Sequence, residues 1–127
     1  MAKFSKDPAY QAFRILQVTF IVAPIVAGLD KFVYMLTNWS NYLAPFVLQL
    51  IRHHDRDFMM FVGLIEVIAG IGVFFKPKIF SYVVSLWLLG IIFNLLLTGS
   101  YFDIALRDLG LMLAAFSLGK LSQKYAL

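Results

Sequence analysis

The sequence predicts an all-α protein: an integral membrane bundle of four helices that run up, down, up and down through a bilayer. Its 127 residues are 61% hydrophobic and 14% charged, with a mean hydropathy of +0.83. Soluble domains carry about 25% charged residues. The hydrophobic residues form four long runs joined by short segments, which leaves no room for a separate catalytic domain. We therefore expect one transmembrane domain over residues 1–127.

The first predicted span covers residues 12–31. Fifteen uncharged residues separate Arg14 from Asp30, and this run would also fit a secretory signal peptide. We favour a retained helix because Pro24, inside the run, is tolerated better in a membrane helix than in a soluble one. A kink is expected at this proline.

The segment 38–51 is expected to lie along the membrane interface between the first two spans. It is polar and aromatic, and Trp39 and Tyr42 suit the level of the lipid headgroups. This pattern predicts a short amphipathic helix with a break near Pro45.

The second predicted span covers residues 58–75, an apolar run that is interrupted by one carboxylate, Glu66. Its 18 residues would extend about 27 Å as a helix, close to the hydrocarbon thickness of a bilayer. An ionisable side chain at this depth costs about 2.5 kcal/mol or more, and it usually faces the protein interior or a water-filled cavity. Glu66 is therefore a candidate site residue.

The third predicted span covers residues 79–102 and follows a tight basic turn at residues 76–78. Its 24 residues carry no charge, which makes it the clearest membrane helix by length. The polar Asn94 inside it is explained either by a ligand or by a hydrogen bond between helices.

The fourth predicted span has the shortest apolar run, with eleven uncharged residues between Asp108 and Lys120. It is either a half-helix or a span over residues 104–121, and we favour the span. Arg107 and Asp108 would then enter the membrane edge, where adjacent opposite charges partly neutralise each other and the arginine extends toward the headgroups. Asp103 is expected to cap the start of this helix.

The polar residues of the four spans are expected to meet. The up-down order places the relevant helix ends on one side of the bundle. At about 100° per residue, each polar residue also shares a face with small residues, which mark where membrane helices pack closely. The predicted polar or ligand-binding cluster consists of Asp30, Lys31, Trp39, Glu66, Asn94, Asp103 and Arg107.

The basic residues predict the orientation in the membrane. Seven of the eleven Lys and Arg residues lie on the side of the two termini and the turn at residues 76–78. Because cytoplasmic segments are enriched in Lys and Arg, both termini are expected in the cytoplasm, and the polar cluster is expected to open toward the outside.

Three short motifs carry a family resemblance: residues 28–32 (GLDKF), residues 63–66 (GLIE) with Gly70, and Pro77 in the basic turn. With them, the chain resembles the DoxX-like family of small four-helix membrane proteins. Residues 101–110 (YFDIALRDLG) are similar to a bacterial subgroup without an assigned role. The resemblance implies a multi-pass protein of the bacterial inner membrane. Some members are subunits of quinone-linked oxidation and others assist redox complexes or maturation, but members that use cysteines offer no guide because this chain has none.

Three functions are compatible with the sequence. The first is a non-catalytic module that assembles with itself or with a redox or maturation partner in the lipid membrane. The second is a subunit that binds quinone or a lipid headgroup between Glu66, Asn94 and Arg107, under Trp39. The third is a small transporter or proton carrier. The sequence requires no cofactor.

Other chemistries are not expected. The net charge of +4 comes from bases clustered on one side, which indicates membrane orientation rather than a nucleic-acid partner. His53 and His54 are neighbours that would point about 100° apart on a helix, so no metal site is predicted. The sequence has no Gly-rich phosphate loop or nucleophile elbow, and we do not expect the chain to be an enzyme on its own.

Overall fold

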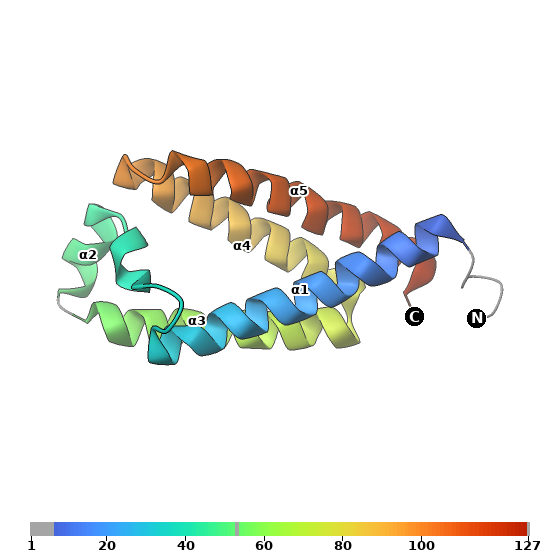
Figure 1. Ribbon diagram of the computed structural model, residues 1–127, viewed down its shortest axis with the longest axis horizontal. Coiled ribbons are helices and arrows are strands. Elements are labelled where there is room, and N and C mark those ends of the chain that lie inside the picture. Colours follow the sequence, from blue (N-terminus) through green and yellow to red (C-terminus); the bar gives the residue numbers. More distant parts are fainter. Residues whose placement is uncertain (1–6, 53, 127) are drawn as a thin grey trace.

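The computed structural model describes residues 7–52 and 54–126, and in these ranges it is all-helical, without a strand. The helices are α1 (Pro8–Val33), the 3₁₀-helix η1 (Trp39–Tyr42), α2 (Pro45–Ile51), α3 (Asp55–Phe75), α4 (Pro77–Thr98) and α5 (Phe102–Tyr125), shown in Figure 1. The all-α prediction is confirmed.

Three of these helices, α1, α3 and α4, are long and apolar enough to cross a membrane. They expose many large apolar side chains, such as Val22, Phe61 and Phe74 at 52%, 60% and 58%. Apolar surface on that scale is unusual for a soluble monomer and is expected where helices face lipid. The chain is therefore a helical protein with three candidate membrane-spanning helices.

The helix ends differ from the predicted spans by a few residues. α1 begins at Pro8 and continues through Pro24 to Val33. α4 ends at Thr98, four residues before the predicted end at residue 102, because Gly99 takes a left-handed conformation with φ 76° and closes the helix.

The predicted cap of α5 is wrong. The N-cap residue is Tyr101, in a left-handed conformation with φ 62°, and no side chain forms a capping hydrogen bond. Asp103 lies in the first helical turn and is exposed. There its negative charge still faces the positive end of the helix dipole.

The segment 38–51 forms two short helices, η1 and α2. They are separated just before Pro45, in agreement with the predicted break. Asn38 caps η1 by accepting a hydrogen bond from the Ser40 backbone. Pro45 occupies the first turn of α2, where its missing N–H costs no hydrogen bond.

The four long helices form two pairs. In the first pair, α1 and α3 approach so closely at Gly28 and Gly63 that a Cβ atom on Gly28 would lie 2.5 Å from the Gly63 carbonyl oxygen. In the second pair, α4 and α5 pack with the ring of Tyr82 over Gly119, where an added Cβ would lie 2.6 Å from the ring. Small residues thus set both helix–helix contacts.

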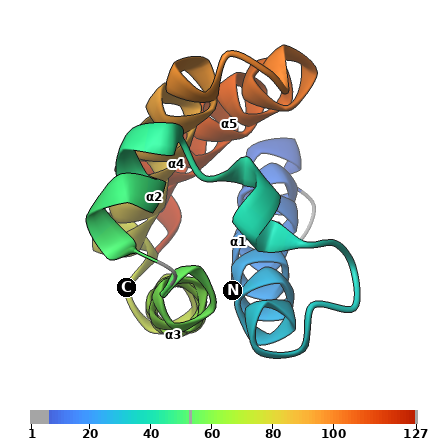
Figure 2. The same ribbon diagram turned by 90° about the vertical axis from the view of Figure 1, so that its left-hand side faces the viewer.

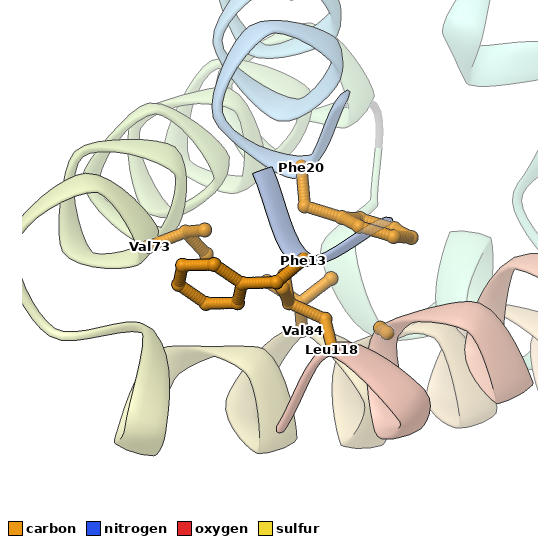
Figure 3. Close-up of a cluster of buried hydrophobic side chains, with 6 residues drawn as sticks. Phe13, Phe20, Val73, Val84 and Leu118 are labelled. Carbon is orange, nitrogen blue, oxygen red and sulfur yellow. The ribbon is translucent and has the colours of Figure 1, made fainter. Parts of the chain in front are cut away.

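The two pairs meet near the chain ends and separate toward α2 (Figure 1). At the meeting point a buried core joins α1, α3, α4 and α5 (Figure 3). It consists of Phe13, Phe20, Val73, Val84, Ala115 and Leu118. The start of α1 and the end of α5 lie at this end of the molecule.

A hydrogen bond between the two chain ends should make stability depend on acid pH. Tyr125 Oη donates to Asp7 Oδ2 at 2.6 Å. This bond, with a second from the Ala9 N–H, holds the pKa of Asp7 below its ordinary value of 3.8. A carboxyl whose pKa is lowered on folding contributes stability above its unfolded pKa, and the contribution is lost as the pH falls through the folded value.

We therefore expect the melting temperature in detergent to fall below about pH 4 more steeply in the wild type than in Asp7→Asn. Melting curves between pH 2.5 and 6 measure this difference. Asp103→Asn, which removes an exposed carboxylate from the start of α5, is the matched control and should keep the wild-type slope. Equal slopes in wild type and Asp7→Asn would contradict the role of this bond.

Candidate functional site

A cleft of about 470 Å³ lies between the two helix pairs. This volume is in the range of small-molecule pockets, about 300–1,000 Å³. Its walls are mainly apolar side chains from α1, α3, α4 and α5, and η1 contributes Trp39 and Tyr42. Five of the seven residues predicted for the polar cluster line it: Lys31, Trp39, Glu66, Asn94 and Arg107.

Glu66 is paired with Lys31. The Lys31 Nζ atom lies 2.5 Å from Glu66 Oε1, and the two side chains are only 7% and 11% exposed. The close packing of Gly28 against Gly63 positions them, since each charged residue follows one of these glycines by three positions, about one helical turn. Lys31 Nζ also lies 3.9 Å from the centroid of the Trp39 ring. The Lys31–Glu66 pair therefore joins α1 to α3.

Arg107 pairs with Asp108 and not with Glu66. Its Nε and Nη2 atoms donate to Asp108 Oδ1 at 3.2 and 3.1 Å. The Asp108 side chain is 5% exposed, whereas the Arg107 side chain is 65% exposed. Arg107 therefore reaches from the rim of the cleft over a buried carboxylate on its own helix.

The charges that line the cleft cancel. They are two cations, Lys31 and Arg107, and two carboxylates, Glu66 and Asp108, joined as two ion pairs. Each ion pair therefore places one positive and one negative group in the wall of the cleft. This arrangement matches a polar group without net charge better than an anion or a cation.

Asp30 does not line the cleft. Its carboxylate instead stabilises the turn that follows α1. Asp30 is buried, and its carboxylate accepts hydrogen bonds from the Met35 and Leu36 backbones and, at 2.8 Å, from Trp39 Nε1. Tyr34 ends α1 in a left-handed conformation with φ 55°. Asp30 thereby stabilises the turn and fixes the position of Trp39 over Lys31.

Asn94 attaches the connecting segment, residues 34–54, to α4. Its amide donates to the Tyr42 carbonyl at 2.6 Å and accepts from the Ala44 N–H at 2.9 Å. The hydrogen bonds of Asp30 and Asn94 thus hold this segment at two points, one on α1 and one on α4. Figure 2 shows η1 and α2 lying across the end of the molecule between these helices.

We expect Asn94→Ala to release this attachment. Two hydrogen bonds to buried or half-buried backbone groups are lost, each worth about 1 kcal/mol. Amide hydrogen exchange should rise in residues 39–51, and the exchange of α1 and α3 should stay unchanged. Ser117→Ala is the control, because that exposed hydroxyl donates only to the Leu113 carbonyl of its own helix. Unaltered exchange in residues 39–51 would rule out the attachment.

Two lining residues were missed by the sequence-based cluster. Asp108 was predicted only as a partner that neutralises Arg107, although it is the more deeply buried of the two. Trp87 shares the predicted inward face of its helix with Asn94, but it is not part of the predicted cluster. Its Nε1–H is buried and has no hydrogen-bond partner among the described residues, a situation that costs about 1–3 kcal/mol. No pattern in the sequence shows that this donor faces no acceptor.

The described His, Asp and Glu residues form no group that could hold a metal ion. His53 lies outside the described residues. His54 is exposed and lies 3.6 Å from Asp57 on the same helix end.

Comparisons of the chain with protein-family models, with curated proteins and with solved structures found no match.

Proposed function

We propose that the chain is a DoxX-like protein of the bacterial inner membrane in which α1, α3, α4 and α5 cross the bilayer up, down, up and down. The three apolar helices support this topology, and so does the position of the start of α1 and the end of α5 at one end of the molecule. The basic residues near the termini and in the turn at residues 76–78 favour placing that end in the cytoplasm. The cleft then opens in the outward half of the membrane.

We further propose that the protein is a non-catalytic membrane module that binds one amphipathic molecule, a quinone or a lipid, in this cleft. The observation that carries the proposal is an apolar cleft between two helix pairs with Lys31, Glu66, Asn94, Arg107 and Asp108 in its wall. Apolar walls suit a hydrocarbon chain, and a few convergent polar groups suit a single polar head. The two ion pairs favour a head without net charge.

A second candidate uses the same residues. In it, the protein is a module that assembles with itself or with a redox or maturation partner, and the ion pairs only stabilise its fold. The short Lys31–Glu66 contact favours this candidate, because each charge already has its partner. It also argues against a proton carrier, which needs a carboxylate that exchanges its proton.

Retention of an amphiphile distinguishes the two candidates. We would extract the protein in native-membrane nanodiscs and quantify quinones and lipids by mass spectrometry, relative to nanodiscs that hold an unrelated membrane protein. The binding proposal predicts about one enriched molecule per chain. Lys31→Met/Glu66→Leu, which replaces the pair with apolar groups and should fold, is expected to lose the enrichment, whereas Ser117→Ala should keep it. A composition equal to that of the surrounding membrane in the wild type would refute binding.

A further inference from the structure

A second, smaller opening continues the cleft sideways. A groove of about 230 Å³ runs between α3 and α4 and shares six lining residues with the cleft, among them Met59, Trp87 and Asn94. Its other lining residues are Val47, Phe58 and Gly90, so its walls are almost wholly apolar. The cleft therefore has a hydrophobic side branch that leads between two candidate membrane-spanning helices.

The divergence of α3 and α4 creates this groove. The helices are joined by a tight turn at Lys76 and separate from there toward α2 (Figure 1). Gly90 lies about 12 Å from the α2 end of α4, and a Cβ atom added to it would meet no heavy atom within 4 Å. This part of the α4 surface is thus open, and the molecules around it in a bilayer are hydrocarbon chains.

We propose that the groove is the lateral entrance of the cleft and that its occupant is an acyl chain of a zwitterionic phospholipid from the outward leaflet. This inference rests on the proposed function and names its ligand. The acyl chain of the lipid lies in the groove between α3 and α4. The lipid headgroup reaches the polar cluster in the cleft, with which the groove is continuous.

The polar groups favour a phospholipid over a quinone. The Lys31–Glu66 and Arg107–Asp108 pairs each offer a cation and a carboxylate, which match the phosphate and the ammonium of a zwitterionic head. A quinone ring carries acceptor oxygens and would use only the cations. Trp87 stands where groove and cleft join, and its unpaired Nε1–H is a donor for an ester carbonyl at the junction of head and chain.

Gly90→Leu tests the groove, because the new side chain extends into it without meeting another atom at Cβ. Gly110→Leu is the matched control: its Cβ also meets nothing within 4 Å, and Gly110 lines neither the groove nor the cleft. The probe is phosphatidylethanolamine with a photoreactive diazirine in one acyl chain, placed in nanodiscs with the full chain. Crosslinks are mapped by peptide mass spectrometry.

We expect crosslinks in the wild type to concentrate on the peptides that contain Phe58, Met59 and Trp87. Gly90→Leu should reduce them at least about tenfold, the loss expected when about two methylene groups no longer reach the groove. Gly110→Leu should keep the wild-type pattern. Melting curves of both variants confirm that they are folded.

Four other outcomes would overturn the inference, and they separate it from the proposed function. Crosslinks spread over all lipid-facing surfaces, or unchanged by Gly90→Leu, refute the lateral groove, even when the protein retains an amphiphile. A retained quinone in place of phospholipid refutes the ligand but supports the cleft. Absence of any retained amphiphile in the wild type refutes the proposed function itself.

Discussion

Replacing Lys31 with methionine should lower the free energy of unfolding by about 3–5 kcal/mol, the cost of leaving one partner of a buried ion pair unpaired. The Glu66 side chain is 11% exposed, so water cannot replace the lost ammonium. Glu66→Leu should be destabilising for the same reason, because it leaves Lys31 buried. In the double variant Lys31→Met/Glu66→Leu both charges are gone, and most of the loss should be recovered.

Reversible unfolding in mixed detergent measures this double-mutant cycle. Lys78→Met, at an exposed position in the first turn of α4, controls for the loss of one positive charge and should change stability by less than about 0.5 kcal/mol. If the stability losses of the two single variants instead added up in the double variant, the Lys31–Glu66 pair would not hold α1 to α3.

Gly63→Ala should cost about 3 kcal/mol, at the upper end of the range for overpacking. The added Cβ would overlap the carbonyl oxygen of Gly28 and lie 3.0 Å from the Lys31 Cβ. Backbone atoms cannot rotate away, so α1 and α3 must move apart. That movement would also disturb the Lys31–Glu66 pair.

Gly110→Ala should change stability in the opposite direction, and it serves as the control for Gly63→Ala. No atom lies within 4 Å of its added Cβ, so the better helix propensity of alanine should stabilise the protein by up to about 1 kcal/mol. Melting temperatures of the two variants report the difference. A stabilised Gly63→Ala would show that the helices are not in contact at this position.

Helical phase was sufficient to predict that Lys31 and Glu66 belong to one polar cluster. Lys31 and Glu66 each follow a glycine by three residues, and small residues on a membrane helix mark the face that packs closely. A charged residue on such a face needs a partner at the same depth. These two facts place Lys31 and Glu66 in one cluster, but they do not choose between Lys31 and Arg107 as the partner of Glu66.

The roles of Asp30 and Arg107 could not be predicted in the same way. The partners of Asp30 are backbone N–H groups that come within reach only because Tyr34 reverses the chain. Arg107 pairs with its neighbour Asp108 and not with the more distant Glu66. Which of the two carboxylates it reaches depends on how far the helix pairs separate. The cleft and the groove depend on the same separation, which no local pattern encodes.

In the proposed function, one amphiphile occupies the space between the two helix pairs. An experimental density map of the protein in nanodiscs of native lipid tests it most directly. We expect an elongated feature that contacts the Lys31–Glu66 pair and extends past Trp87 between α3 and α4. Closed helix pairs with side chains filling the cleft, and no such feature, would contradict it.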